Sequence, residues 1–171
     1  RLSAMIDNRE IFFIPVVNVD GFYYRTRYDN NVDPNRSYPY PKNPNATPTA
    51  SIRALIDFFN AHNFAGSIDF HAYGELIMYP WAYTYQSIEE EYRAPFHALA
   101  GAMAQTNHYT FGPISKVIYV AEGSSADYYF WQKKTKAFAI EVGRAKQPVP
   151  TQIQAYTEAQ AEPLWRFIES F

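Results

Sequence analysis

Polar side chains suited to bond hydrolysis are spread along the 171-residue sequence. Glu141 ends the apolar run KAFAIE, and a half-buried glutamate at the end of a strand can have a raised pKa and act as a general base. His71 ends the segment SIDFH, in which strand alternation places Asp69 on the same face. A single histidine is more often structural than a metal ligand, and an ion pair with nearby Arg144 explains Glu141 equally well.

Other residue types in the sequence suit recognition of a substrate. The pair Asn35-Arg36 lies in NVDPNRSYP, and a guanidinium can hold a carboxylate through two parallel hydrogen bonds. On composition alone, a solvated loop is the commoner explanation for such a pair. Tyr119 lies in VIYVAEGSSAD, where Gly123 and two serines favour a mobile loop, and a tyrosine there is equally compatible with a plain surface ring.

The elements that must position these side chains alternate between strands and helices. Apolar runs bounded by polar residues predict strands at 11–17, 67–71, 76–79, 117–119 and 136–142. Helical spacing predicts helices at 49–63, 87–105, 124–133 and 151–171, with a capping box at Ser87–Glu90 and a break near Pro163. Residues 18–49, rich in Asn, Asp, Pro and Tyr, predict a long ordered loop. The sequence therefore predicts an α/β fold with a mixed, largely parallel sheet flanked by helices.

Composition argues against several classes of partner. The 15 basic and 17 acidic residues give a net charge of -2 and are mixed along the chain, which leaves no electrostatic footprint for nucleic acid or an anionic membrane. No apolar run is long enough to cross a bilayer, and the lack of cysteine excludes disulfides and thiolate metal sites. The length predicts one domain. Because the chain opens at Arg1 without an initiator methionine or a leader, we expect that an N-terminal portion is missing.

Five motifs, taken in order, resemble those of the zinc carboxypeptidases of the carboxypeptidase A type along nearly the whole chain. They are FFIPVVNVDGF, NVDPNRSYP, IDFHAYGELIMYPW, IYVAEGSSADYYF and KAFAIEVG. The resemblance implies that residues 1–171 are the C-terminal part of a single catalytic domain with a carboxypeptidase-like fold. The sequence departs from the family at Val19, Pro34 and Ser37, where the family has Pro, Leu and Asn.

The resemblance also implies which residues carry out the reaction. His71 would supply the last protein ligand to zinc, and Glu141 would accept a proton from zinc-bound water and pass it to the leaving amine. An arginine just after Tyr24 would polarise the scissile carbonyl and stabilise the oxyanion. The position before a threonine favours Arg25, and Arg27 is the alternative.

The substrate implied by the resemblance is a peptide with a free C-terminal carboxylate. Asn35 and Arg36 would bind that carboxylate, and Tyr119 would close over the bound residue. Tyr73 would line the subsite on the other side of the scissile bond. Ala126 would lie in the specificity pocket, where a small neutral residue favours neither a basic side chain nor the largest aromatic ones. By the same resemblance, the protein would be secreted or periplasmic.

The expected zinc site is incomplete in this sequence. In the family, the first two ligands form a His-x-x-Glu motif, and none of the histidines here is followed three residues later by glutamate. We therefore expect the isolated chain to be inactive and to need the missing N-terminal part of its domain as a partner. Two other functions remain open: a cell-wall peptidase of the same fold that cuts γ-glutamyl or diamino-acid bonds, and a non-catalytic relative that binds peptide C-termini. An upstream His-x-x-Glu would favour catalysis, and its absence would favour the binding module.

Overall fold

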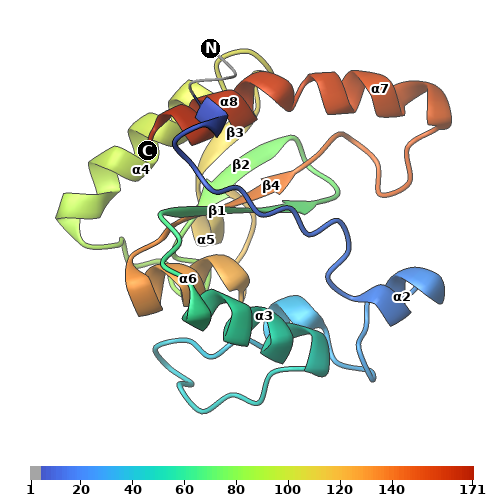
Figure 1. The fold of residues 1–171 in the computed structure, drawn as a ribbon, viewed down its shortest axis with the longest axis vertical. Helices are drawn as coiled ribbons and strands as arrows, with labels where there is room; N and C mark the ends of the chain where they lie inside the picture. Colours follow the sequence, from blue (N-terminus) through green and yellow to red (C-terminus); the bar gives the residue numbers. More distant parts are fainter. Residues whose placement is uncertain (1–4) are drawn as a thin grey trace.

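The computed structural model describes residues 5–171, whose four strands form a mixed sheet between two layers of helices (Figure 1). The strands are β1 (Gly66–His71), β2 (Leu76–Tyr79), β3 (Thr110–Pro113) and β4 (Lys136–Glu141), and their spatial order is β1-β4-β2-β3. β1 and β4 are parallel, as are β2 and β3, whereas β2 and β4 are antiparallel. The predicted α/β fold with a mixed sheet flanked by helices is confirmed.

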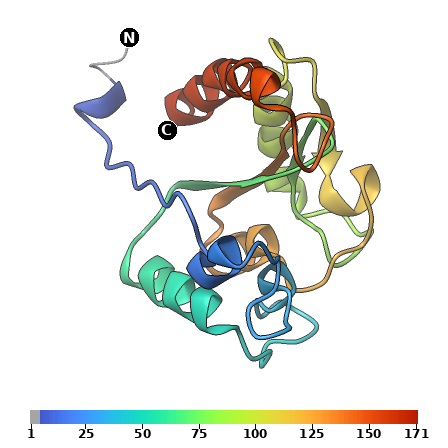
Figure 2. The same ribbon diagram turned by 90° about the vertical axis from the view of Figure 1, so that its right-hand side faces the viewer.

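The helices cover both faces of the sheet, as the side view in Figure 2 shows. They are α2 (Val19–Tyr23), α3 (Ala50–Ala61), α4 (Glu90–Met103), α5 (Ile114–Val117), α6 (Ser125–Lys133), α7 (Pro150–Glu158) and α8 (Ala161–Glu169), with a 3-10 turn, η1, at Pro34–Arg36. Side chains of α4 and α8 pack on one face, and those of α3 and α6 fill much of the other. Within residues 5–171, none of these helices has the length and apolar character needed to span a membrane.

The side chains of β4 decide how closely each helical layer can approach. Its large residues, Phe138 and Ile140, pack on the side of α4 and α8, whereas its small residues, Ala137 and Ala139, face the side of α3. Aromatic rings fill the space above these two alanines: Tyr38, Phe59, Tyr128 and Tyr129. Because interiors are close-packed, this alternation of large and small residues seats α3 and the N-terminal half of α6 directly beside the sheet.

Most predicted elements are confirmed to within two residues. These are α3, α6, β1, β2 and β4. The final helical stretch is divided into α7 and α8, as Pro163 predicted, but the break lies at Ala159 and Gln160. Pro163 instead sits in the first turn of α8, where a backbone N–H has no intrahelical acceptor to lose. The region 18–49 is largely irregular and holds only α2 and η1 as short helices.

Two short-range predictions are wrong. Residues 117–119 form no strand, because the chain makes the unpredicted strand β3 first and then turns through α5. The apolar side chains of Ile118 and Tyr119 are exposed there instead of pairing with a sheet. The predicted capping box at Ser87–Glu90 is also absent: α4 begins at Glu90, and its N-cap residue Glu89 makes no side-chain capping bond.

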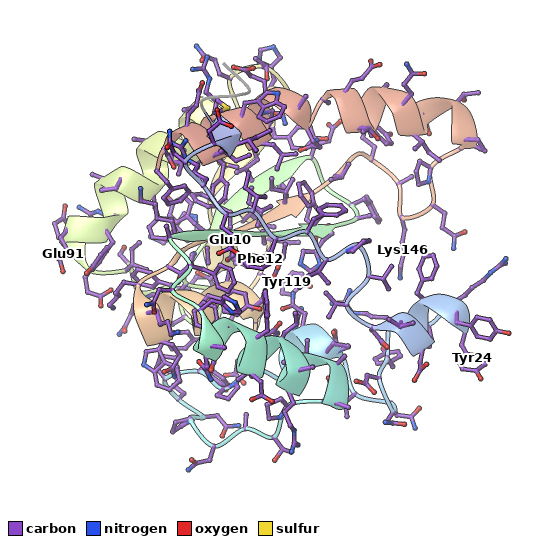
Figure 3. The ribbon with its side chains drawn as sticks, in the orientation of Figure 1. Glu10, Phe12, Tyr24, Glu91, Tyr119 and Lys146 are labelled. Carbon is purple, nitrogen blue, oxygen red and sulfur yellow. The ribbon has the colours of Figure 1, made fainter. Side chains whose placement is uncertain are left out.

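The predicted strand at 11–17 is wrong as well. In the described chain these residues form neither a strand nor a helix, and Phe13 is 82% exposed. Phe12 instead lies edge-on against the rings of Phe58 and Phe64, beside the end of α3 (Figure 3). A strand needs a neighbour for its backbone N–H and C=O groups, and none of the four described strands pairs with this run.

One lysine joins the end of α3 to the end of α6. Lys133 Nζ donates hydrogen bonds to the carbonyl oxygens of Phe59 at 3.0 Å, Asn60 at 3.1 Å and His62 at 2.6 Å. The last carbonyls of a helix lack intrahelical donors, and a cation there also interacts favourably with the helix dipole. This contact therefore ties the two helices of one layer together.

Replacing Lys133 by Met keeps the aliphatic stem and removes the charged donor. We expect the free energy of unfolding to fall by about 2 kcal/mol, since hydrogen bonds to charged groups contribute roughly that much. Urea denaturation of the 171-residue chain measures this change. Lys146→Met, at an exposed lysine in the loop after β4 (Figure 3), is the matched control and should change stability by less than about 0.5 kcal/mol. Equal effects of the two substitutions would contradict the capping role.

Candidate active site

A small cleft lies at the ends of β1 and β4, where polar side chains from several segments meet. Its volume is about 70 Å³, and its lining consists of Arg27, Asn35, Arg36, His71, Met78, Ile118, Tyr119, Ala121, Ala139 and Glu141. His71 and Glu141 are partners in the register of β1 and β4, and each is the last residue of its strand. Because parallel strands end at the same edge of a sheet, the pairing itself places these two residues side by side.

Glu141 is a half-buried carboxylate that lacks a full set of hydrogen bonds. Burial raises its pKa, and electrostatic interactions with His71 and Arg27 oppose that rise. Its Oε2 atom is buried and accepts no hydrogen bond from the described part of the chain. Arg144, the ion-pair partner considered from the sequence, binds Glu75 instead, with 2.9 Å between Nε and Oε2. The carboxylate is therefore available to accept a proton.

Asn35 connects three parts of the site. Its Oδ1 accepts a hydrogen bond from the Ser125 N–H at 3.0 Å, and its Nδ2 lies 3.5 Å from His71 Nε2. The backbone N–H of Asn35 donates to Asp33 Oδ1 at 3.0 Å, so Asp33 caps the η1 turn. Sequence reasoning missed Asp33, although an aspartate before Pro34 is a capping signal that could have found it.

The guanidinium next to Glu141 belongs to Arg27. Its Nε donates to Asp33 Oδ2 at 2.7 Å, which holds the side chain in the cleft lining. Arg25, which the sequence favoured for this position, does not line the cleft. It lies in the turn after α2 with a left-handed φ of 54°, and Figure 3 shows its neighbour Tyr24 at the outer end of that helix. The geometry thus brings the alternative, Arg27, to the site.

Arg36 and Tyr119 meet across the cleft from segments 83 residues apart. Arg36 Nη2 donates to the Tyr119 hydroxyl at 3.0 Å, and its Nη1 donates to the backbone oxygen of Asn35 at 2.6 Å. A guanidinium has five N–H donors, so others remain for a ligand. Tyr119 is 51% exposed, and its neighbours Ile118 and Val120 are exposed too.

Two residues expected at the site lie outside the cleft lining. Tyr73 is 53% exposed in the loop between β1 and β2. Ala126 is buried in the first turn of α6. The cleft lining therefore includes five residues of the predicted set, His71, Glu141, Asn35, Arg36 and Tyr119, and it does not include Tyr73, Ala126 or Arg25.

The donor atoms at the site do not form a metal-binding group by themselves. Within residues 5–171, no three His, Cys, Asp or Glu side chains lie close enough together to hold an ion. Zinc in a hydrolase takes three protein ligands and a water. His71 is therefore one suitable donor, and the described residues do not complete a zinc site around it.

The fold and the cleft define an α/β domain with its polar residues at the ends of parallel strands. Comparison with known proteins agrees with this class. The family model for zinc carboxypeptidases matches residues 1–163, and the chain belongs to this family.

Individual relatives match over only part of their own length. Carboxypeptidase A4 of Mus musculus is 27% identical over 180 residues, covering 82% of this chain and 42% of the relative. Carboxypeptidase B of Rattus norvegicus is 25% identical over 183 residues, covering 83% of this chain and 43% of the relative. The chain thus spans less than half the length of these curated relatives.

Solved carboxypeptidase structures share the fold. The carboxypeptidase A from Helicoverpa armigera superposes with a TM-score of 0.73 at 17% identity, covering 90% of this chain and 49% of that one. Thrombin activatable fibrinolysis inhibitor superposes with a TM-score of 0.74 at 20% identity, covering 99% of this chain and 54% of that one.

Gly123 allows the loop after Tyr119 to approach the Arg36 backbone. Its φ is +72°, and a Cβ at this position would lie 2.5 Å from the Arg36 carbonyl oxygen. The Gly123 carbonyl in turn accepts a hydrogen bond from the Tyr38 N–H at 3.2 Å. Only glycine satisfies both the left-handed backbone and the close approach.

Gly123→Ala is therefore expected to push the Arg36 turn away from the cleft. We expect the free energy of unfolding to fall by about 1–3 kcal/mol, the cost of a strained backbone position. Denaturant titration measures the loss, and amide chemical shifts of residues 35–38 should change. Gly101→Ala within α4 is the control: alanine favours a helix by about 0.5–1 kcal/mol over glycine, and its Cβ would meet only the side-chain ring of Phe111, at 3.3 Å, and no backbone atom. A neutral Gly123→Ala variant with unshifted amides would disprove the close approach.

Proposed function

We propose that the protein containing this chain is a metallocarboxypeptidase, which hydrolyses the C-terminal peptide bond and releases the C-terminal amino acid. The main support is the convergence of Arg36, Tyr119 and Glu141 on one cleft from three separate segments. Membership of the zinc carboxypeptidase family supports the same reaction. A secreted or periplasmic location is part of this proposal.

Substrate recognition rests on the guanidinium of Arg36. Its remaining donors can take both oxygens of a terminal carboxylate, and Asn35 lies next to it to contribute an amide N–H. The Tyr119 hydroxyl already meets Arg36, so an arriving carboxylate would share or replace this contact while the exposed ring covers the bound residue. Recognition of a terminal carboxylate would restrict cleavage to chain ends.

Glu141 is the proposed general base. Its buried Oε2 has room for a proton, and its raised pKa makes it a better acceptor than an exposed glutamate. It would take the proton of the attacking water and deliver it to the nitrogen of the leaving amine. Arg27, which lines the cleft with Glu141, would stabilise negative charge on the carbonyl oxygen, the role for which the sequence favoured Arg25 and left Arg27 as the alternative.

The proposed cofactor of the whole protein is zinc, with His71 as one ligand. Zinc would polarise the carbonyl and acidify the attacking water. Because no three His, Cys, Asp or Glu side chains of residues 5–171 lie close enough together to hold an ion, the remaining ligands would come from a part of the protein outside the chain. The coverage of about 42% of the relatives leaves room for such a part, which would be the partner of this chain within one domain.

The role of Glu141 is tested by Glu141→Gln in the complete protein. Glutamine preserves shape and hydrogen bonding but cannot accept the proton, so kcat should fall by roughly 10²–10⁴-fold, the usual contribution of a general base, with little change in KM. Steady-state hydrolysis of a blocked dipeptide measures both constants. A kcat within tenfold of the unmodified protein would remove Glu141 from this role.

The exopeptidase character is tested by blocking the substrate's terminal carboxylate. A C-terminally amidated peptide should be cut at least 100-fold more slowly than its free acid, and Arg36→Gln should raise KM for the free acid without affecting the amide, because only the acid uses the guanidinium. Equal cleavage of both peptides would exclude carboxylate recognition and favour another peptidase specificity. Tight binding of the free acid with no cleavage would favour the non-catalytic binding relative.

A further inference from the structure

Asp127 is a fully buried carboxylate that the proposed reaction does not use. It lies in the first turn of α6 and is 0% exposed. Its Oδ1 accepts a hydrogen bond from the Ala82 N–H at 2.8 Å, and its Oδ2 accepts one from the Tyr83 N–H at 2.9 Å. Both oxygens therefore hold the same short segment, which follows β2.

This arrangement is costly for the fold. Burial raises the pKa of Asp127 to about 7, and the bonds from Ala82 and Tyr83 only partly oppose the rise. A neutral side chain would avoid the desolvation of a carboxylate, but only a carboxylate presents two equivalent acceptors in one plane. The benefit that offsets the cost is a fixed position for two successive backbone N–H groups.

The segment held by Asp127, residues 81–84, in turn holds both ends of the Tyr119 loop. At the first end, Ser115 donates its N–H to Trp81 O at 3.1 Å and its hydroxyl to Thr84 O at 2.7 Å. At the other end, the Ala121 N–H donates to Ala82 O at 2.9 Å. Ser115 and Ala121 are buried, whereas the loop between them is exposed at 118–120.

The same turn of α6 holds the opposite side of the cleft. The Ser125 N–H donates to Asn35 Oδ1 at 3.0 Å, which fixes the residue before Arg36. Two residues later, Asp127 fixes residues 81–84, which hold the loop of Tyr119. One helical turn therefore sets where the guanidinium and the phenol stand relative to each other, and they meet at 3.0 Å.

We propose that Asp127 is a positioning residue, which aligns Tyr119 with Arg36 by clamping residues 81–84 to the first turn of α6. The proposal rests on the proposed binding of a terminal carboxylate by Arg36 and Tyr119. Asp127 contacts no substrate and acts only through the loop that it holds.

The decisive substitution is Asp127→Asn, which keeps size but replaces one acceptor with an NH2 group facing a backbone N–H. In the complete protein, we expect KM for peptides with a free C-terminus to rise about tenfold while kcat stays within threefold. Tyr119→Phe, which removes the hydroxyl that meets Arg36, should raise KM by itself but add less than twofold to Asp127→Asn. If the two substitutions act independently, their free-energy effects add and their fold-changes in KM multiply. That result in the double variant would overturn the proposal.

A control separates positioning from simple loss of stability. Phe167→Leu alters a buried ring in α8, which packs against Phe138 of β4 and against Phe171. It should lower the unfolding temperature in the same way as Asp127→Asn but leave KM unchanged. A matching rise in KM for Phe167→Leu would reduce Asp127 to a structural residue.

A second measurement needs no substrate, so it distinguishes failure of this proposal from failure of the proposed function. In Asp127→Asn, amide hydrogen exchange at Ser115 and Ala121 should be at least tenfold faster than in Phe167→Leu, because their acceptors lie on the released segment. Unchanged exchange at these amides overturns the clamp whatever the enzymatic activity. Faster exchange in a protein that neither binds nor cuts free C-termini would uphold the clamp and reject the peptidase assignment.

Discussion

The parallel pairing of β1 with β4 is the constraint on which the site depends. It brings His71 and Glu141 to the same edge of the sheet in register, and the His71 carbonyl continues the ladder by accepting the Val142 N–H at 2.8 Å. Parallel strands cannot be joined by a tight turn, so the chain between them must leave and return. That long connection carries β2, α4, β3, α5 and α6, and with them the Tyr119 loop. The route that the pairing imposes thus brings in Tyr119, whereas Arg27, Asn35 and Arg36 come from the segment before β1.

The N-terminal turn of α6 is the second organising feature, because it joins parts of the chain that share no strand. Ser124 accepts the Asp127 N–H through its hydroxyl oxygen and begins the helix, Ser125 holds Asn35, and Asp127 holds residues 81–84. The small residues of β4 make this possible, since the alanines on that face leave space for the tyrosines of α6 to pack against the sheet. The packing of α6 on the sheet therefore also sets the geometry of the cleft.

The sequence predicted those elements whose pattern is local. β4 alternates large and small apolar residues before Glu141, and α6 starts at a serine that caps it, so both could be located without tertiary information. Residues 11–17 have an equally strong apolar pattern, but a strand also needs a neighbour, which composition does not reveal. The exposed aromatic residues of that run show that strand propensity alone does not form a strand where no neighbouring strand pairs with it.

The choice between Arg25 and Arg27 shows a different limit. The turn that separates them from α2 places Arg25 in the left-handed region, and Asn30 and Asn31 adopt it soon afterwards. A residue in the left-handed region changes the direction in which the following side chains point, and no hydrophobic periodicity in the sequence reveals it. The bond from Arg27 to Asp33 holds its guanidinium in the cleft lining, and Asp33 itself caps the η1 turn. Family resemblance narrowed the choice to Arg25 and Arg27, and tertiary contacts show that Arg27 is the one that lines the cleft.

The buried oxygen of Glu141 connects the stability of the domain with its chemistry. Leaving a buried acceptor without a donor costs about 1–3 kcal/mol, and a structural glutamate at this position could have recovered that energy from a nearby cation. Arg144 lies three residues away but binds Glu75, and Arg27 is held by Asp33. Each of the two nearby guanidinium groups is thus engaged by another carboxylate, which keeps Glu141 from being neutralised by a permanent ion pair. Local energetic inefficiency of this kind is common at functional sites, and it supports the proposed role of Glu141 more strongly than its position at the end of a strand does.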